Sequence, residues 1–296
     1  MSHQAIDLGA RTLLRLSGGD RQRYLNGQVS NDVRKLDGNN AIAACVTTLK
    51  GKLDALVHIT EHADAYLIDS EPELREPLLA RLGRYIIADD CELEDVSDEW
   101  RLIHIIGEFG LPPEGAAAIS RRSERFGQPG TDLWLATGAA VPDGLTILSN
   151  AESEAQRIRN GVPRWGAELT PDTLPAEAGL DATAIDFHKG CYIGQEVISR
   201  IKSVGRVNRK LVRMRVSGGD QPEEPLRPGM RVFHDDREVG SLTSVAGPEA
   251  LGFVKRNHDQ PGTRLKLASP ADACDADDDG KKILSTSLEI VESRQV

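Results

Sequence analysis

The sequence predicts an α+β fold with a small β-barrel at its C-terminal end. Strand-like and helix-like segments alternate up to Gly205, and several strands are joined by connections of hairpin length, which require antiparallel pairing. Six short strands then follow with turns between them, a pattern typical of a small barrel or sandwich. The 296 residues suffice for two domains. We place the boundary near Gly205, so that residues 1–205 form the α+β core and residues 206–296 the barrel.

The composition is that of a folded protein with an acidic surface. Hydrophobic residues make up 39% of the chain and charged residues 28%, so a packed core is expected and wholesale disorder is not. The formal net charge is −10, whereas proteins that coat nucleic acid or anionic lipid non-specifically are normally basic. An anionic ligand must therefore bind a local basic patch.

The sequence predicts a cytoplasmic protein. No apolar run approaches the roughly 18 residues that span a bilayer, and the N-terminal segment has neither the charge pattern nor the cleavage site of a secretory signal. The four cysteines, at positions 45, 91, 191 and 274, form no CxxC pair, which argues against a disulfide scaffold and against a local zinc site. We therefore expect a reducing compartment and no resident metal.

The N-terminal part predicts a strand, a helix and an antiparallel meander. Thr12–Leu16 is a short apolar strand, and Asp20 is placed to cap a helix that carries Tyr24 and Leu25. Three strands with connections of hairpin length follow, at Ala41–Thr48, Leu53–Thr60 and Ala65–Asp69.

The middle of the core alternates helices and strands. Ser70 and Glu73 have the spacing of a capping box before a helix with leucines on one face. An alanine-rich segment predicts a helix at about Glu114–Arg122, and a further helix starts near Ala151 and ends at Gly161. The strands predicted around these helices are Cys91–Val96, Arg101–Ile106, Asp132–Thr137 and Thr146–Leu148.

The last part of the chain begins with a long segment without periodicity. Residues 161–190 are rich in Pro and Gly, and a loop of this length inside a domain is usually functional or a linker. A helix near 194–203 follows. The six strands of the C-terminal domain are then Lys210–Val216, Met230–His234, Val239–Val245, Leu251–Lys255, Arg264–Leu267 and Leu284–Val291.

The densest group of chemistry-bearing residues is the run 188–196, which contains Cys191. This cysteine is expected at or just before a helix N-terminus, beside Lys189 and near His188, so that the helix dipole and the cations favour its thiolate, the reactive form. The glycines on either side leave the sulfur approachable. We therefore expect Cys191 to be the functional centre, although a buried cysteine that fills a turn is the alternative.

Residues 197–219 are basic although the chain as a whole is acidic. Seven Lys and Arg residues and no acidic residue lie between Glu196 and Asp220. The run is either a solvated face that acids from elsewhere in the fold balance, or an anion site for carboxylates or phosphates.

Asp54 is a lone acid in an otherwise apolar strand. Burial at this position would suit an acid/base role, whereas a strand-edge acid that faces water is the alternative.

Two further patterns favour no site. His58 and His62 are four residues apart, but they fall on a strand and a turn, so we interpret them as a solvated pair. The run 275–280 starts like a calcium loop, but Thr286 stands where a bidentate Glu is needed, so we interpret it as an acidic turn.

Several segments together resemble one protein family. The run Phe187–Glu196 closely resembles the signature of the YgfZ family, which is related to the glycine-cleavage T-protein (an aminomethyltransferase) and includes a mitochondrial iron–sulfur assembly factor. Tyr24–Val33 resembles the early helix and turn of the family, and Lys50–Lys52 its hairpin. Arg157–Gly166 resembles the T-protein segment that ends in Gly-x-Pro. The resemblance covers most of residues 10–215.

The resemblance implies a T-protein-like core with a tetrahydrofolate pocket. Asp54 matches the T-protein aspartate next to the reactive nitrogen of the folate, and Arg157 matches an arginine near the folate. Lys189 in the signature belongs to the expected cofactor-binding set. Arg206 and Arg209 complete this set, because arginines suit the carboxylates of a folate polyglutamate.

Two departures from the T-protein pattern bear on the chemistry. Ala55 stands where the T-protein has a second acid, and Leu135 stands where it has a glutamate in the segment that contacts the pterin. Both weigh against full aminomethyl transfer. The Cys191 signature belongs to the YgfZ branch and not to the T-protein.

These features lead to one expected function and two alternatives. We expect a cytoplasmic, tetrahydrofolate-binding factor that supports the assembly or repair of iron–sulfur proteins and affects tRNA modification indirectly, with Cys191 as its reactive group. Its partners are then folate and iron–sulfur client or assembly proteins, with no membrane. The alternatives are a tetrahydrofolate-dependent aminomethyltransferase that uses Asp54, and a module that binds tRNA through the basic run.

Overall fold

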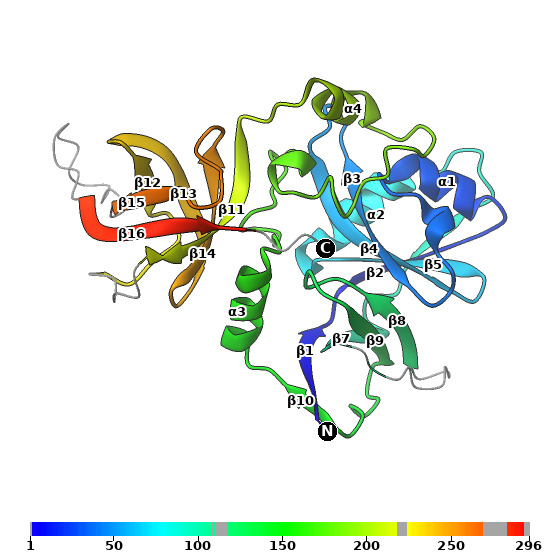
Figure 1. Cartoon of the computed structure of the whole chain (residues 1–296). Coiled ribbons are helices and arrows are strands. Elements are labelled where there is room, and N and C mark those ends of the chain that lie inside the picture. Colours follow the sequence, from blue (N-terminus) through cyan, green and yellow to red (C-terminus); the bar gives the residue numbers. More distant parts are fainter. Residues whose placement is uncertain (1, 108, 110–117, 218–223, 269–282, 293–296) are drawn as a thin grey trace.

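The computed structural model describes residues 2–107, 109, 118–217, 224–268 and 283–292, and their strands form three sheets. Two sheets are open and five-stranded, and the third is a closed barrel of six strands. Figure 1 shows the barrel on one side of the molecule and the open sheets on the other, with α3 (Asn150–Asn160) next to the barrel. The predicted α+β fold with a C-terminal barrel is therefore confirmed.

The first open sheet contains the predicted meander and has the order β3-β4-β5-β2-β6, with antiparallel neighbours throughout. Along β4, buried and half-buried residues alternate from Leu53 to Val57, as expected for a strand with one face on the core. Apolar side chains of α1 and α2 pack on this sheet. The bounds are β2 (Thr12–Ser17), α1 (Arg21–Gln28), β3 (Ala41–Thr47), β4 (Leu53–His62), β5 (Ala65–Ser70), α2 (Arg75–Gly83) and β6 (Glu92–Asp95).

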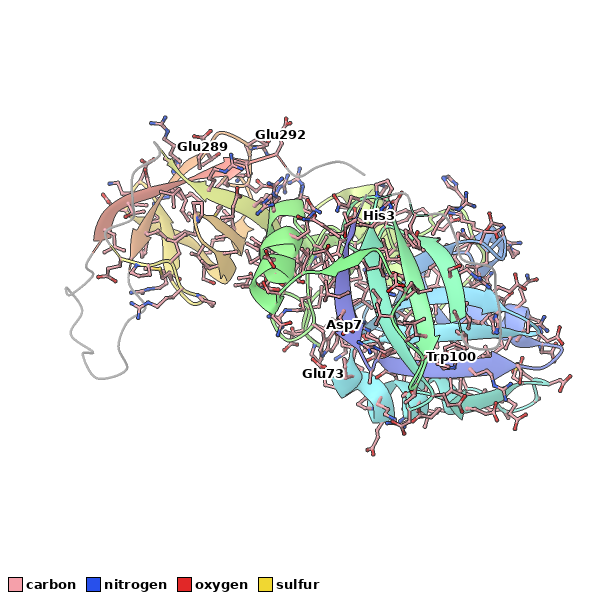
Figure 2. All side chains as sticks on the ribbon, turned by 90° about the horizontal axis from the view of Figure 1, so that it is seen from below. His3, Asp7, Glu73, Trp100, Glu289 and Glu292 are labelled. Carbon is pink, nitrogen blue, oxygen red and sulfur yellow. The ribbon has the colours of Figure 1, made fainter. Side chains whose placement is uncertain are left out.

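The second open sheet has the order β10-β1-β7-β9-β8. Its first strand, β1, was not predicted; it pairs in parallel with β10 and antiparallel with β7. In Figure 2, Asp7 and Trp100 of this sheet lie to the right of α3, and Glu289 lies to its left, at the barrel. The bounds are β1 (His3–Gly9), β7 (Trp100–Ile106), β8 (Ala118–Ser123), β9 (Gly130–Ala136) and β10 (Leu145–Ile147).

The helix predicted at Glu114–Arg122 is wrong in its described part. Residues 118–123 form β8, which pairs along its whole length with β9, and residues 114–117 lie outside the described residues. Ile119 of this strand is fully buried and packs in a cluster with Trp134 and Leu102. Strand pairing and burial therefore outweigh the helix preference of the alanines.

The other predicted helices are present, but the side-chain caps predicted at Asp20 and Ser70 are not. Asp20 precedes α1 but makes no side-chain capping hydrogen bond, and its carboxylate accepts from the Asp90 amide instead. Ser70 is the last residue of β5, and its hydroxyl donates to a backbone carbonyl of β4 at 2.9 Å, so it makes no capping box for α2. A short 3-10 turn, Pro72–Leu74, precedes that helix instead. By contrast, α3 has a capping box between Ser149 and Glu152 and ends at Gly161 in the left-handed conformation. None of the described helices is long and apolar enough to cross a membrane.

The barrel follows α4 (Gln195–Val204), and all six of its predicted strands are found. Their order is β11-β14-β13-β12-β15-β16, and the interior is filled by apolar side chains such as Met214, Met230 and Leu265. Closure of the sheet removes free strand edges. The domain boundary at Gly205 stays a prediction. The bounds are β11 (Arg209–Val216), β12 (Arg231–His234), β13 (Arg237–Ala246), β14 (Glu249–Lys255), β15 (Arg264–Ala268) and β16 (Ile283–Val291).

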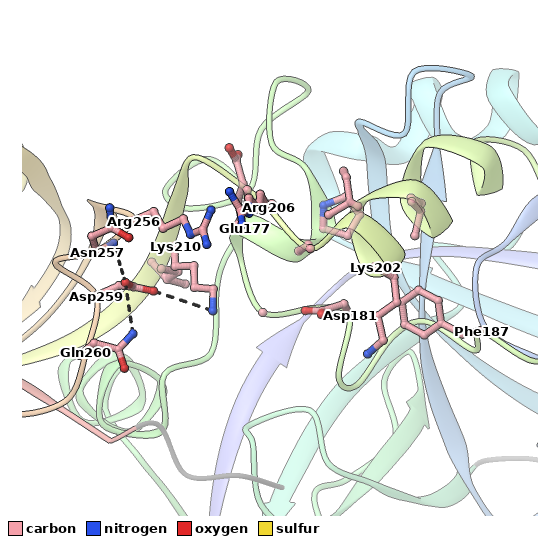
Figure 3. Close-up of a pocket in the computed structure, with 18 residues that line it drawn as sticks. Glu177, Asp181, Phe187, Lys202, Arg206, Lys210, Arg256, Asn257, Asp259 and Gln260 are labelled. Atoms are coloured by element: carbon pink, nitrogen blue, oxygen red, sulfur yellow. Dashed lines mark hydrogen bonds and ion pairs between the residues drawn. The ribbon is translucent and has the colours of Figure 1, made fainter.

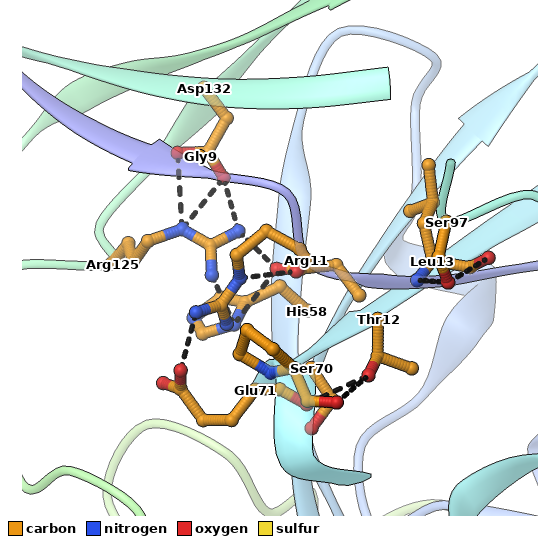
Figure 4. A network of polar contacts seen from close by, with 12 residues as sticks. Gly9, Arg11, Thr12, Leu13, His58, Ser70, Glu71, Ser97, Arg125 and Asp132 are labelled. Atoms are coloured by element: carbon orange, nitrogen blue, oxygen red, sulfur yellow. Dashed lines mark hydrogen bonds and ion pairs between the residues drawn. The ribbon is translucent and has the colours of Figure 1, made fainter. Parts of the chain in front are cut away.

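A buried ionic network joins the two open sheets (Figure 4). Arg125, which follows β8, lies 2.8 Å from Asp132 of β9 and 2.6 Å from Asp69 of β5. Arg11, between β1 and β2, contacts the other oxygen of Asp69 at 2.8 Å, and His104 of β7 contacts Asp132 at 2.8 Å. These five side chains are at most 7% exposed, so each charge depends on its partners and not on water.

The network determines the protonation of its members. Burial alone would raise the pKa of Asp132, but the Arg125 charge and the His104 hydrogen bond outweigh it and hold this pKa well below its ordinary range. His58 contacts Arg125 at 3.0 Å, and burial followed by the Arg125 charge lowers its pKa well below the ordinary value. The prediction of a solvated His58 is therefore wrong, because its side chain is 14% exposed and belongs to this network.

Replacing Arg125 with Met should destabilise the fold by about 3–5 kcal/mol, because Asp132 and Asp69 then stay buried without this partner. Arg122→Met is a matched control: Arg122 is 65% exposed and pairs only with an exposed Asp37 within the described residues, so a change within about 0.5 kcal/mol is expected. Urea unfolding measures both. A loss below about 1 kcal/mol for Arg125→Met would show that the network does not stabilise the fold.

Acid should weaken the same network. The pKa of Asp132 lies lower in the folded chain than the value of about 3.9 expected when it is unfolded, so its stabilisation is complete above that pH and is lost as the pH falls below it. Without Arg125, the Asp132 pKa is lowered less, so Arg125→Met should lose less stability between neutral and acidic pH than the unaltered chain does. Urea midpoints of both proteins, measured over this pH range, check the difference.

Candidate functional site

The signature residues 187–196 fold into a loop, residues 187–194, and the first two residues of α4 (Gln195–Val204). We call residues 187–194 the signature loop, and it lies against the end of α1. The buried ammonium of Lys189 donates to three backbone carbonyls, those of Asn26, Val29 and Asn31, each at 2.7 Å. Its three N–H groups are thereby all used. All three carbonyls belong to the early motif named above, so two of the segments that carry the family resemblance touch each other.

Further contacts fix the loop between α1 and β3. The Ile193 amide donates to the Gly27 carbonyl at 3.3 Å, and the Ile193 carbonyl accepts from the Thr47 hydroxyl at 2.6 Å. Gly194 has a φ of +87°, and a Cβ there would lie 2.5 Å from the Thr48 carbonyl oxygen. Only glycine fits this position, because any other residue would clash with the Thr48 carbonyl and would be strained at this φ.

These contacts give Lys189 a role different from the predicted one. We expected its charge to favour the Cys191 thiolate, but its N–H groups are directed to carbonyls of the early motif. Burial lowers the Lys189 pKa to about 8, and the carboxylates of Asp32 and Asp186 oppose this effect only in part. Lys189 therefore holds the signature loop in place, and a contact with a cofactor stays a prediction.

Cys191 is exposed on this loop. Helix α4 starts at Gln195 with Gly194 as its N-cap, so the cysteine precedes the cap by three positions, outside the turn in which a helix dipole acts. A chemical role of Cys191 is therefore supported by its exposure to solvent and not by the dipole of α4.

The other described cysteines are less accessible. Cys45 is fully buried, and burial raises its pKa to about 12. Cys91 is partly buried, and burial, followed by the charge of Asp89, raises its pKa. Cys274 lies outside the described residues. Among the described cysteines, Cys191 is therefore the most accessible to a reactant from solvent.

Asp54 lies near the start of β4, paired with an arginine that sequence reasoning missed. Arg81 of α2 donates to the Asp54 carboxylate at 3.0 Å, to the Gln28 side chain at 3.0 Å and to the Thr47 carbonyl at 3.1 Å. The Asp54 side chain is 29% exposed, so it keeps contact with solvent. Because Thr47 also bonds to Ile193, polar contacts connect Asp54 to the signature loop.

Arg157 is buried in a different place, where α3 meets the barrel. Its guanidinium donates to Glu154, to the Val162 carbonyl at 2.6 Å, to Glu168 at 3.0 Å and to the Ser244 hydroxyl at 2.6 Å. These bonds use all five N–H groups of the side chain. The arrangement joins α3 to β13, and the predicted contact of Arg157 with folate stays a prediction.

A pocket of about 520 Å³ lies between α4 and the barrel, and we call it the junction pocket (Figure 3). Its walls come from the loop before α4, from α4 itself, and from the turn after β14. Arg206 lines this pocket, whereas Asp54, Arg157, Lys189 and Arg209 are not part of its lining. The structure therefore does not gather the predicted folate-binding residues around this pocket.

Most charges of the basic run are balanced by acids from elsewhere, as one of the two interpretations predicted. Lys202 and Arg206 are exceptions, since neither makes an ion pair within the described residues. Arg209 pairs with Glu177 at 3.2 Å and lies over the Phe253 ring. The other ion pairs in the run are Arg200–Glu196, Lys210–Asp259 and Arg215–Glu249.

No group of three or more His, Cys, Asp and Glu side chains within the described residues is arranged to hold a metal ion. The acidic run 275–280 lies outside the described residues.

No protein-family model matches the chain, but curated relatives are similar over most of it. The tRNA-modifying protein YgfZ of Escherichia coli O157:H7 is 24% identical, over 88% of this chain and 87% of the relative. A chloroplast protein of Arabidopsis thaliana that is named as a transferase is 26% identical, over 85% of this chain and 65% of its own length. A mitochondrial iron–sulfur cluster assembly factor homologue of Mycosarcoma maydis is 28% identical, over 68% of this chain and 54% of its own length. The chain thus spans less than two thirds of the plant and fungal relatives.

The solved structure of the glycine cleavage system aminomethyltransferase T from Bartonella henselae superimposes with a TM-score of 0.82. The match covers 100% of this chain and 87% of that one, at 17% sequence identity, and it therefore shows a common fold. The resemblance drawn from the signature and the early motif agrees with both comparisons. The chain is therefore similar in sequence to the YgfZ proteins and has the fold of aminomethyltransferase T.

Proposed function

We propose that this chain is a cytoplasmic, tetrahydrofolate-binding factor that supports the assembly or repair of iron–sulfur proteins. The observation that carries the proposal is an exposed cysteine, Cys191, on a loop that buried hydrogen bonds hold in place. Relatives named for tRNA modification and for iron–sulfur cluster assembly support the iron–sulfur part, and the T-protein fold supports the folate part. An effect on tRNA modification is then indirect, through iron–sulfur enzymes that modify tRNA.

The chemistry proposed for Cys191 follows from its position. A thiolate is both a nucleophile and a soft metal ligand, and an exposed one is accessible to a group on a second protein. The thiolate must be held in a fixed geometry, which the hydrogen bonds of Lys189 and Thr47 in this part of the chain provide. A client or assembly protein of the iron–sulfur pathway is therefore the proposed partner.

One-carbon transfer centred on Asp54 is the second candidate, and the fold favours it. Asp54 is half-buried beside Arg81 and is connected to the signature loop. Against it stands Leu135, which replaces a T-protein glutamate and is buried in the core of the second sheet. Direct tRNA binding has less support, because acids of the same chain pair with most of the basic run.

Tetrahydrofolate should raise the melting temperature of the chain. A ligand that binds only the folded state stabilises it by about 2.7 kcal/mol at a hundredfold excess over its dissociation constant. Asp54→Ala should reduce the shift, whereas Asp64→Ala, an exposed acid in the turn after the same strand, should not. Differential scanning fluorimetry with tetrahydrofolate protected from oxidation measures both. A flat response of the unaltered chain at saturating ligand would contradict folate binding.

Cys191→Ala should abolish the rescue of iron–sulfur enzyme activity in cells that lack the protein. The side chain is exposed, so its loss opens no cavity, and the fold and folate binding should stay intact. Cys91→Ala is the control and should rescue fully. Limiting iodoacetamide at neutral pH should also label Cys191 before Cys45 and Cys91. If Cys191→Ala rescues fully, the cysteine is structural and one-carbon transfer becomes the better proposal.

Lys189→Met should loosen the signature loop while the chain stays folded. The change keeps an unbranched side chain but removes three hydrogen bonds to backbone carbonyls, and an unpaired buried polar group costs about 1–3 kcal/mol. Amide hydrogen exchange at Ile193 should become faster and rescue should weaken. Lys35→Met, which removes only the ion pair of a half-exposed lysine with Asp186, should change neither. Unchanged exchange at Ile193 in Lys189→Met would show that the other contacts hold the loop by themselves.

A further inference from the structure

We propose that the junction pocket binds the γ-glutamyl chain of a folate polyglutamate. The proposal rests on the folate binding proposed above and assigns the anionic part of that ligand. Arg206 and Arg209 were predicted from the sequence for this role. Arg209 pairs with Glu177 and does not line the pocket, so we assign Arg256 in its place, a residue that no sequence pattern indicated. Arg206 is retained.

Four cationic side chains line the pocket, and they come from separate parts of the chain (Figure 3). Lys202 lies on α4 and Arg206 follows it, Lys210 lies on β11, and Arg256 follows β14. Within the described part of the chain, neither Arg206 nor Arg256 makes an ion pair, and both are exposed. Two unpaired guanidinium groups on one pocket suit bidentate binding of carboxylates.

The acidic groups of the pocket are largely neutralised inside the protein. Glu177 accepts from Arg209 at 3.2 Å. Asp259 lies 3.8 Å from the Lys210 ammonium and accepts from a backbone amide at 3.1 Å. Of the acids in the lining, Asp181 alone then makes no ion pair among the described residues. Its single negative charge compares with three positive charges that are also unpaired, those of Lys202, Arg206 and Arg256. The unpaired groups of the pocket therefore favour an anion.

The pocket also has an apolar wall, which a simple inorganic anion does not need. The Lys202 ammonium lies 4.8 Å from the centre of the Phe187 ring, so even this charge has an apolar neighbour. A γ-glutamyl chain alternates carboxylates with short methylene segments and thus matches both kinds of surface. The volume of about 520 Å³ falls in the usual range for small-molecule sites. The apolar side chains of the wall are Phe187, Ile198, Ile201, Val207 and Leu211.

The position of the pocket connects it to the candidate reactive group. Phe187 is the first residue of the signature loop, and α4 is the helix that follows this loop. A ligand in the pocket therefore contacts the first residue of the segment that presents Cys191 and the helix that follows this segment.

The test compares chain lengths of the ligand in two matched double variants. Arg206→Ala/Arg256→Ala removes the two unpaired guanidinium groups of the pocket. Arg200→Ala/Arg237→Ala removes two exposed guanidinium groups that do not line it, so the net charge of the two variants is equal. Isothermal titration calorimetry at low salt measures the binding of tetrahydrofolate monoglutamate, tetrahydrofolate pentaglutamate, free penta-γ-glutamate and an α-linked pentaglutamate peptide.

We expect the unaltered chain and the control variant to bind the pentaglutamate more tightly than the monoglutamate. The pocket variant should lose about tenfold or more in affinity for the pentaglutamate, as expected for lost charge-assisted hydrogen bonds, and little for the monoglutamate. Added salt should reduce this difference.

Other outcomes separate this proposal from the proposed function. Equal losses for both folates, or no loss, overturn the pocket assignment and leave folate binding standing. If the unaltered chain binds neither folate, the proposed function fails, and free penta-γ-glutamate then tests the pocket by itself. Binding of this peptide that the pocket variant loses supports the pocket assignment. Absence of binding overturns the pocket assignment. If the α-linked peptide binds as tightly as the γ-linked chain, the pocket accepts acidic protein segments and the folate assignment is overturned.

Discussion

The hydrogen bonds of the Lys189 ammonium connect two segments that are about 160 residues apart in sequence. Two of the three bonds are fully buried, where a lost hydrogen bond is costly, so they favour one conformation of the loop. The exposure of Cys191, the start of α4 and the position of Phe187 in the junction pocket all depend on that conformation. Lys189 thus fixes the position of the loop through backbone carbonyls, and Cys191 is the residue of this loop that we propose to react.

Much of the fold was predictable because local pattern and burial agree. The alternation in β4, the capping box of α3 and the turns between the barrel strands are visible in the sequence and present in the structure. Prediction was wrong where a distant partner decides. Residues 118–123 form a strand because β9 pairs with them. Ser70 does not cap the N-terminus of α2 because its hydroxyl donates to a backbone carbonyl of β4.

The candidate site was predictable only in part, for a related reason. Cys191 and its loop were found because the signature is a continuous run of residues. The partners of Lys189 are backbone carbonyls, which carry no side-chain signal, and Arg81 contacts Asp54 from another element. Nothing in the sequence distinguishes Arg206 from Arg209 as a ligand for an anion. In the folded chain, however, Glu177 pairs with Arg209 and not with Arg206. Contacts between distant segments thus mark the limit of what sequence reasoning predicts here.

The buried carboxylate of Glu168, which is 1% exposed, bears on the modularity of the molecule. It accepts hydrogen bonds from the hydroxyls of Thr243 and Ser244 on the barrel, and from the Arg157 guanidinium and the Arg164 backbone amide on the core side. Without the two hydroxyls, a desolvated charge would lose half of its partners. In evolutionary terms the barrel is therefore not a freely exchangeable unit. A different barrel takes its place only if it brings two hydroxyl donors to the positions of Thr243 and Ser244.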